Sequence, residues 1–144
     1  MGIETEYGLR AVMTGDREQV DPEAAAHELF HDVLEYGRST NAFLANGARL
    51  YLDVGAHPEY ATAECDNIDD LLAQDKAGDA LFVDMINASH ARQGDYRIHL
   101  FKNNVDSAGN SYGCHENYLI RRRRDFRARI NLSLIHISEP TRLL

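Results

Sequence analysis

Residues 46–64, NGARLYLDVGAHPEYATAE, contain the pattern that decides the fold. In their first half apolar and polar side chains alternate, which is typical of a β-strand with one buried and one open face. The open face would carry a cation, a phenol and a carboxylate, from Arg49, Tyr51 and Asp53. The face expected to be buried consists of Ala48, Leu50, Leu52 and Val54.

The acidic character of this stretch continues beyond a turn predicted at residues 55–58. Glu59, Thr62 and Glu64 follow that turn. Carboxylates on adjacent strands with an arginine beside them suit Mg²⁺ and a nucleotide phosphate, because Mg²⁺ prefers oxygen ligands. A purely structural network of ion pairs is the alternative that the pattern alone leaves open.

The first strand of the chain is predicted at residues 3–12. Glu4 and Glu6 are two residues apart, so both would project from one face of that strand. Two carboxylates on one face repel each other unless a cation or hydrogen bonds offset the repulsion. They are either ligands of Mg²⁺ or the charges of an exposed edge strand that resists aggregation.

Two helices are predicted from apolar residues at helical spacing. The first occupies residues 22–37, with Asp21 as its N-cap. The second occupies residues 68–91, where Asp75 and Gly78 interrupt the apolar side. This interruption indicates either the close approach of another element or a buried ion pair.

Two further strands are predicted at residues 96–103 and 115–120, on either side of a loop rich in Gly, Ser and Asn. We expect these two strands to form a hairpin. His115 and Glu116 add polar groups beside the loop and are weaker candidates for a functional site. Together the elements predict an α+β fold, in which helices pack on an antiparallel sheet.

The composition limits the partners of the chain. Its 144 residues are enough for one domain with a core, and its net charge of −8 argues against a general nucleic-acid binder. No apolar run is long enough to span a membrane, and the first residues show no basic and apolar leader. Cys65 and Cys114 are too few for a disulfide scaffold and fit a reducing cytoplasm.

The usual phosphate-binding loops do not occur in the sequence. There is no GxxxxGK[ST] loop and no GxGxxG turn after a strand. There is also no GxSxG motif and no zinc-ligand spacing. A nucleotide would therefore have to be held by side chains on the antiparallel sheet.

Three long segments resemble one known family: MGIETEYG at the start, residues 46–65, and LFKNNVDSAGNSYGCHENYLI at residues 100–120. They are similar to the N-terminal part of the family of Pup ligases and Pup deamidases, where Pup is the prokaryotic ubiquitin-like protein. The resemblance covers residues 1–130. It implies the carboxylate–amine ligase fold shared with glutamine synthetase, here incomplete because the family proteins are much longer.

The resemblance also implies a reaction and a set of site residues. ATP phosphorylates the side-chain carboxylate of the C-terminal glutamate of Pup, and a lysine amine of a target protein then attacks to form an isopeptide bond. By position, the resemblance assigns Mg²⁺ ligation to Glu4, Tyr51 and Glu59, ATP contacts to Arg49 and Thr62, and the role of catalytic base to Asp53. Glu6 is a secondary candidate for the metal.

Two activities occur in this family. The deamidase, which also acts as a depupylase, carries a long insertion between its first strand and the NGARLY strand, whereas here only a modest loop and one helix are predicted between Gly8 and Asn46. This difference favours the ligase, and the deamidase is the alternative. A third hypothesis is that the chain as given is a catalytically inert fragment.

The last residues of the chain do not resemble the family. SLIHISEPTRLL, at residues 133–144, is similar to translated sequencing-adapter read-through. We therefore interpret residues 1–130 as the N-terminal part of the catalytic domain and residues 131–144 as a non-native tail.

Overall fold

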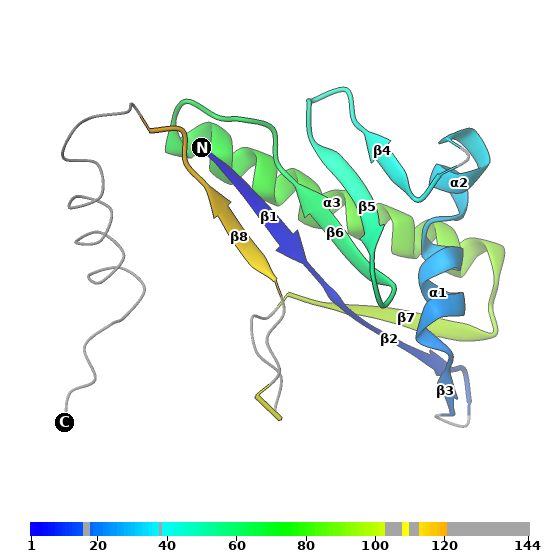
Figure 1. Cartoon of the computed structure of the whole chain (residues 1–144). Helices are drawn as coiled ribbons and strands as arrows, with labels where there is room; N and C mark the ends of the chain where they lie inside the picture. The colour runs from blue at the N-terminus through cyan, green and yellow to red at the C-terminus, as the bar shows by residue number, and fades with distance from the viewer. Residues whose placement is uncertain (16–17, 38, 103–107, 110–112, 121–144) are drawn as a thin grey trace, which may run out of the picture.

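The computed structural model describes residues 1–15, 18–37, 39–102, 108–109 and 113–120. The predicted boundary at residue 130 and the tail beyond it lie outside these residues. Within them, two antiparallel sheets are covered by helices, which confirms the predicted α+β class (Figure 1). No helix of this part combines the length and the apolar character needed to cross a membrane.

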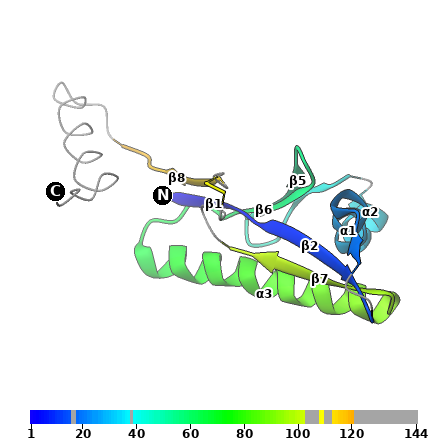
Figure 2. The same ribbon diagram turned by 90° about the horizontal axis from the view of Figure 1, so that it is seen from below.

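The larger sheet includes the two strands formed by residues 46–64. Its strands, in spatial order, are β4 (Asn41–Phe43), β5 (Arg49–Asp53), β6 (His57–Ala61), β1 (Gly2–Glu6) and β8 (Cys114–Asn117). The smaller sheet contains, in order, β3 (Gln19–Val20), β2 (Gly8–Met13) and β7 (Tyr96–Phe101). The helices are α1 (Pro22–Leu29), α2 (His31–Gly37) and α3 (Ile68–Arg92), and Figure 2 shows α3 running along one side of the strands.

The prediction of a single strand at residues 3–12 is wrong, because the chain passes from the larger sheet to the smaller one at Tyr7. The strand before it pairs with β6 and β8, and the strand after it pairs with β3 and β7. Tyr7 is buried, and its amide donates to the carbonyl of Pro58 at 2.8 Å. Its ring packs against Phe82 of α3, with the centroids 4.6 Å apart. Burial of this aromatic ring holds Tyr7 at the position where the chain passes from one sheet to the other.

The predicted hairpin of the last two strands is also wrong. β7 pairs with β2 and β8 pairs with β1, so the two strands belong to different sheets. The division of the first strand explains the error, because each half takes one of the later strands as its partner. Periodicity identifies strands but not their partners, which can be distant in the sequence.

The helices agree with the sequence more closely than the strands do. Asp21 caps α1, with its carboxylate accepting from the Ala24 amide at 3.1 Å. The predicted helix over residues 22–37 is interrupted at Phe30, a fully buried residue between α1 and α2. α3 ends one residue beyond the predicted range and is capped by Asn67, which accepts from the Asp70 amide at 2.8 Å.

The core lies between one face of the sheets and the helices. Leu50 is buried there as predicted, whereas Val54 is 90% exposed because β5 ends at Asp53 and the chain then turns. The core residues with the largest side chains are Tyr7, Leu29, Phe30, Leu50, Tyr60, Phe82 and Ile98. Burying one face of the larger sheet leaves its opposite face open to solvent.

Of the two features predicted at the interruption of α3, the close approach occurs, whereas the ion pairs of Asp75 and Asp79 with Lys102 are only partly buried. A Cβ built on Gly78 would lie 2.5 Å from a ring carbon of Tyr60, so the sheet approaches the helix closely there. The next residue, Asp79, accepts hydrogen bonds from Tyr7 at 2.7 Å and from Lys102 at 3.0 Å. Burial alone would raise the pKa of Asp79, but hydrogen bonds from Lys76, Tyr7 and Lys102 lower it to about 2.

Replacing Gly78 by alanine should destabilise the fold by about 1–2 kcal/mol. The added methyl group would overlap the buried ring of Tyr60, and overpacking of this kind costs about 1–3 kcal/mol, partly offset by the better helix propensity of alanine. Chemical denaturation measures the change. Gly94→Ala is the control, because nothing lies within 4 Å of its added Cβ. Equal stability of Gly78→Ala and the unchanged chain would contradict the close packing.

Candidate functional site

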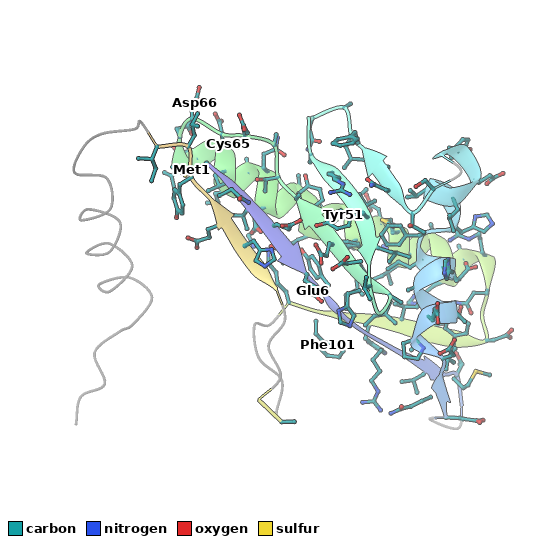
Figure 3. All side chains as sticks on the ribbon, viewed as in Figure 1. Met1, Glu6, Tyr51, Cys65, Asp66 and Phe101 are labelled. Atoms are coloured by element: carbon teal, nitrogen blue, oxygen red, sulfur yellow. The ribbon has the colours of Figure 1, made fainter. Side chains whose placement is uncertain are left out.

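The open face of the larger sheet gathers the acidic side chains of three strands. Tyr51 lies opposite Glu59 in the β5–β6 pair, and Glu59 lies opposite Glu6 in the β6–β1 pair. Residues directly opposite one another in a pair of strands project to the same face. Figure 3 shows Tyr51 and Glu6 on either side of the strand that carries Glu59. Glu4 is two residues before Glu6 and shares this face, as predicted.

The outer carboxylates of this face are held by neighbouring polar groups. The hydroxyl of Tyr51 donates to one oxygen of Glu4, and Nδ1 of His115 lies 3.0 Å from the other. This hydrogen bond with Glu4 raises the pKa of His115. Glu6 contacts Nδ1 of His57 and accepts from the amide of Gly113 at 2.5 Å. Both glutamates are therefore oriented along the face.

Glu59 occupies the centre of the face. Its side chain is buried, with 6% of the residue exposed. Burial, followed by repulsion from Asp53, Glu4 and Glu6, raises the pKa of Glu59 to about 7. The charged form of this carboxylate is disfavoured by its surroundings, and a cation placed among these groups would offset that cost.

A cation from the protein stands at one side of the acidic face. The guanidinium of Arg49 lies 4.1 Å from the centre of the Tyr51 ring, and its Nε donates to Oδ1 of Asn41 at 2.9 Å. The face is hollowed there into an open recess of about 550 Å³. The recess is lined by Glu4, Ser39, Thr40, Asn41, Arg49, Tyr51, Leu52, Asp53, Glu59 and His115.

The residues of the recess fit a hard divalent cation. Glu4, Glu59 and Tyr51 supply oxygen atoms, which are the ligands that Mg²⁺ and Ca²⁺ take. Among the described residues, only His31, Asp32 and Glu35 hold three ligand atoms within 4.8 Å of one another, and these exposed side chains lie on α2 away from the face.

Three candidates from the sequence do not line this recess: Glu6, Thr62 and Glu116. Thr62 lies outside the recess, and its hydroxyl accepts from the amide of Ile3 at 3.0 Å. It lines a neighbouring recess of about 630 Å³, which shares Glu4 with the first. Glu116 pairs with Ile3 and so lies on the opposite face of the sheet, where it accepts from the hydroxyl of Tyr118 at 2.7 Å. The strand register therefore does not group Glu116 with the other candidates.

Sequence reasoning missed three polar residues that line the recess: Ser39, Thr40 and Asn41. They precede β5 in a stretch that we assigned to a connection. A signal was present, because Asn41 and Phe43 alternate with the more buried Ala42 and Leu44. This short alternation marks β4 as a strand whose exposed positions share the face of Arg49 and Tyr51 in β5.

Comparison with known proteins identifies the family. The sequence model described as Pup-ligase protein matches residues 1–137. The chain is 57% identical over 129 residues to a Pup–protein ligase of Brachybacterium faecium and 55% identical over 130 residues to one of Mycolicibacterium smegmatis. These matches cover 87% and 88% of the chain but only 27% and 28% of the relatives, so the chain spans about a quarter of their length.

Solved structures give the same result. The structure of a complex between Pup and its ligase PafA matches with a TM-score of 0.81 and 49% identity, over 88% of this chain and 26% of that one. A structure of the Pup ligase PafA in complex with ADP matches with a TM-score of 0.55 and 49% identity, over 89% and 27%. The family resemblance seen in the sequence is confirmed, and the chain belongs to the Pup-ligase family.

Proposed function

We propose that this chain forms the nucleotide- and metal-binding part of an ATP-dependent ligase that attaches Pup to lysine amines of target proteins. The observation that carries the proposal is the open sheet face on which one arginine stands beside a group of carboxylates. Membership of the Pup-ligase family and the ADP complex of a relative support it. We further propose that the enzyme acts in the cytoplasm, which agrees with the free thiol of Cys65.

The residues of the predicted site take the following roles in this proposal. Glu4, Tyr51 and Glu59 hold Mg²⁺, which when bound neutralises phosphate charge and so eases the approach of the anionic glutamate of Pup. Arg49 donates hydrogen bonds to the phosphates of ATP. Thr62, in the neighbouring recess, contacts another part of the nucleotide.

Asp53 is the proposed base of the second step. A lysine amine is protonated near neutral pH and becomes a nucleophile only when it loses that proton. Asp53 is exposed at the end of β5 and lines the same recess as Arg49 and Tyr51. Its carboxylate takes the proton as the amine nitrogen attacks the glutamyl phosphate of Pup. The C–N bond forms, and phosphate leaves.

The deamidase activity of the family is the second candidate. The structure contains only β2, β3, α1, α2 and β4 between β1 and β5, with no long insertion in the described residues of this interval. The similar proteins described above are named as ligases. Both observations favour the ligase.

A chimera tests the proposal. In it, residues 1–130 replace the matching segment of the Mycolicibacterium smegmatis ligase, which is 55% identical over 130 residues. Supplied with Mg-ATP, Pup ending in glutamate and a lysine-bearing protein, this chimeric ligase should form the conjugate. Absence of conjugate, together with deamidation of Pup ending in glutamine, would overturn the ligase proposal in favour of the deamidase. We propose that residues 1–144 alone are inactive, so the same assay on them is the control.

A further inference from the structure

We infer that Asn41 is a positioning residue, which holds the guanidinium of Arg49 in the orientation that a nucleotide phosphate requires. The inference rests on the proposed function and deepens it, because it concerns how the site keeps a cation available for ATP. It follows from the contacts that Arg49 makes and from the contacts that it does not make.

Two contacts in different directions fix the guanidinium. Asn41 lies opposite Tyr51 in the β4–β5 pair, on the same face of the sheet and diagonal to Arg49. Its Oδ1 accepts from Nε of Arg49 at 2.9 Å, which fixes the group within its own plane. The Tyr51 ring lies 4.1 Å from Cζ and supports the guanidinium by a cation–π contact.

The contacts of Arg49 are unusual for a cation with acidic neighbours. Arg49 shares its recess with Glu4, Asp53 and Glu59, so an ion pair with one of them would be expected. Among the residues that the structure describes, none of these carboxylates forms a salt bridge with Arg49. The acceptor that holds it is the neutral amide of Asn41. The positive charge is thereby kept in place without being neutralised.

The terminal nitrogens of Arg49 remain available to a ligand. Within the described part of the chain, neither Nη1 nor Nη2 of Arg49 donates a hydrogen bond to the protein, whereas Nε is bound to Asn41. The outer edge of a guanidinium donates two parallel hydrogen bonds, a geometry that matches two phosphate oxygens. Because Asn41 and Tyr51 order the side chain before the nucleotide arrives, binding does not carry the full cost of ordering it.

Asn41→Leu in the chimeric ligase tests the inference, because leucine has a similar size and no acceptor. The Kd for ADP and the KM for ATP should rise about 3- to 10-fold, as expected when a long side chain must be ordered on binding. The maximal turnover should change less than KM. Asn87→Leu, an exposed position on α3, is the matched control and should leave both values unchanged.

A double-mutant cycle separates positioning from a structural role. In an Arg49→Gln background, Asn41→Leu should have no further effect on the Kd for ADP, since the group that it positions is gone. Asn41→Asp should also weaken binding, because a carboxylate keeps the hydrogen bond but neutralises the arginine.

The outcomes separate the inference from the proposed function. An effect of Asn41→Leu that is equal with and without Arg49 would assign Asn41 a structural role and overturn the inference. Unchanged nucleotide affinity in Asn41→Leu would do the same. If the unsubstituted chimeric ligase bound no ADP at all, the proposed function itself would fail.

Discussion

Asp53→Asn should reduce conjugation by the chimeric ligase at least about 100-fold while leaving its affinity for ADP nearly unchanged. General bases contribute about 10²- to 10⁴-fold to the rates of enzymes, and an amide cannot take the proton of a lysine amine. Single-turnover formation of the Pup conjugate measures the chemical step. ADP titration of the same preparation measures binding.

The position of Asp53 makes this substitution a specific test. The side chain is exposed at the end of β5, and the backbone carbonyl, not the carboxylate, accepts from the amide of Ala56 at 3.1 Å. Asparagine has nearly the same size and keeps that backbone bond. Asp69→Asn, in the first turn of α3, controls for the loss of one negative charge. Near-normal conjugation by Asp53→Asn would refute the assignment of the base.

Glu59→Gln should have opposite effects on metal binding and on stability. Loss of a central carboxylate should weaken Mg²⁺ binding to the chimeric ligase by at least about tenfold, and conjugation should fall with it. Without Mg²⁺, the same substitution should stabilise residues 1–144 at pH 8, because it removes a buried charge that Asp53, Glu4 and Glu6 repel. Calorimetric titration and thermal unfolding measure the two effects.

The direction of the pH dependence follows from the raised pKa of Glu59. The pKa of this carboxyl group is about 7 in the folded chain and has the ordinary value of 4.5 in the unfolded chain. Between these values the folded state binds more protons, so this group contributes less to stability as the pH rises toward 7. Glu59→Gln should remove that part of the pH dependence. If the stability of Glu59→Gln changed between pH 5 and pH 8 in the same way as that of the unchanged chain, the assignment of the raised pKa to Glu59 would be contradicted.

Glu116→Gln provides the matched control for Glu59→Gln. Glu116 lies on the opposite face of the same sheet and is exposed, so the same chemical change occurs away from the recess. We expect unchanged Mg²⁺ binding and unchanged conjugation. A loss of Mg²⁺ binding in this control would show that the effect of Glu59→Gln reflects the sheet as a whole.

The sequence was most informative where a single strand decides the geometry. Alternation placed Arg49, Tyr51 and Asp53 on one face, and spacing placed Glu4 and Glu6 together, because the side-chain period of a strand is local. The structure confirms both groupings through the strand register. These five residues form most of the polar surface that surrounds Glu59.

The errors came from features that local patterns do not contain. The change of sheet at Tyr7 depends on contacts with Pro58 and Phe82, which are distant in the sequence. The position of Thr62 depends on where β6 ends, since its hydroxyl turns to the amide of Ile3 once the strand is over. Strand partners and strand ends are set by tertiary contacts, and periodicity says little about either.

The place of β1 between β6 and β8 determines when the acidic face can form during translation. β5 and β6 are neighbours in the chain, but Glu4 meets His115 only after β8 has left the ribosome. A nascent chain of about 100 residues therefore exposes the outer edge of β1 as unpaired backbone. Chaperones that recognise extended segments would bind at that edge, and the acidic face would be among the last parts of the described fold to be completed.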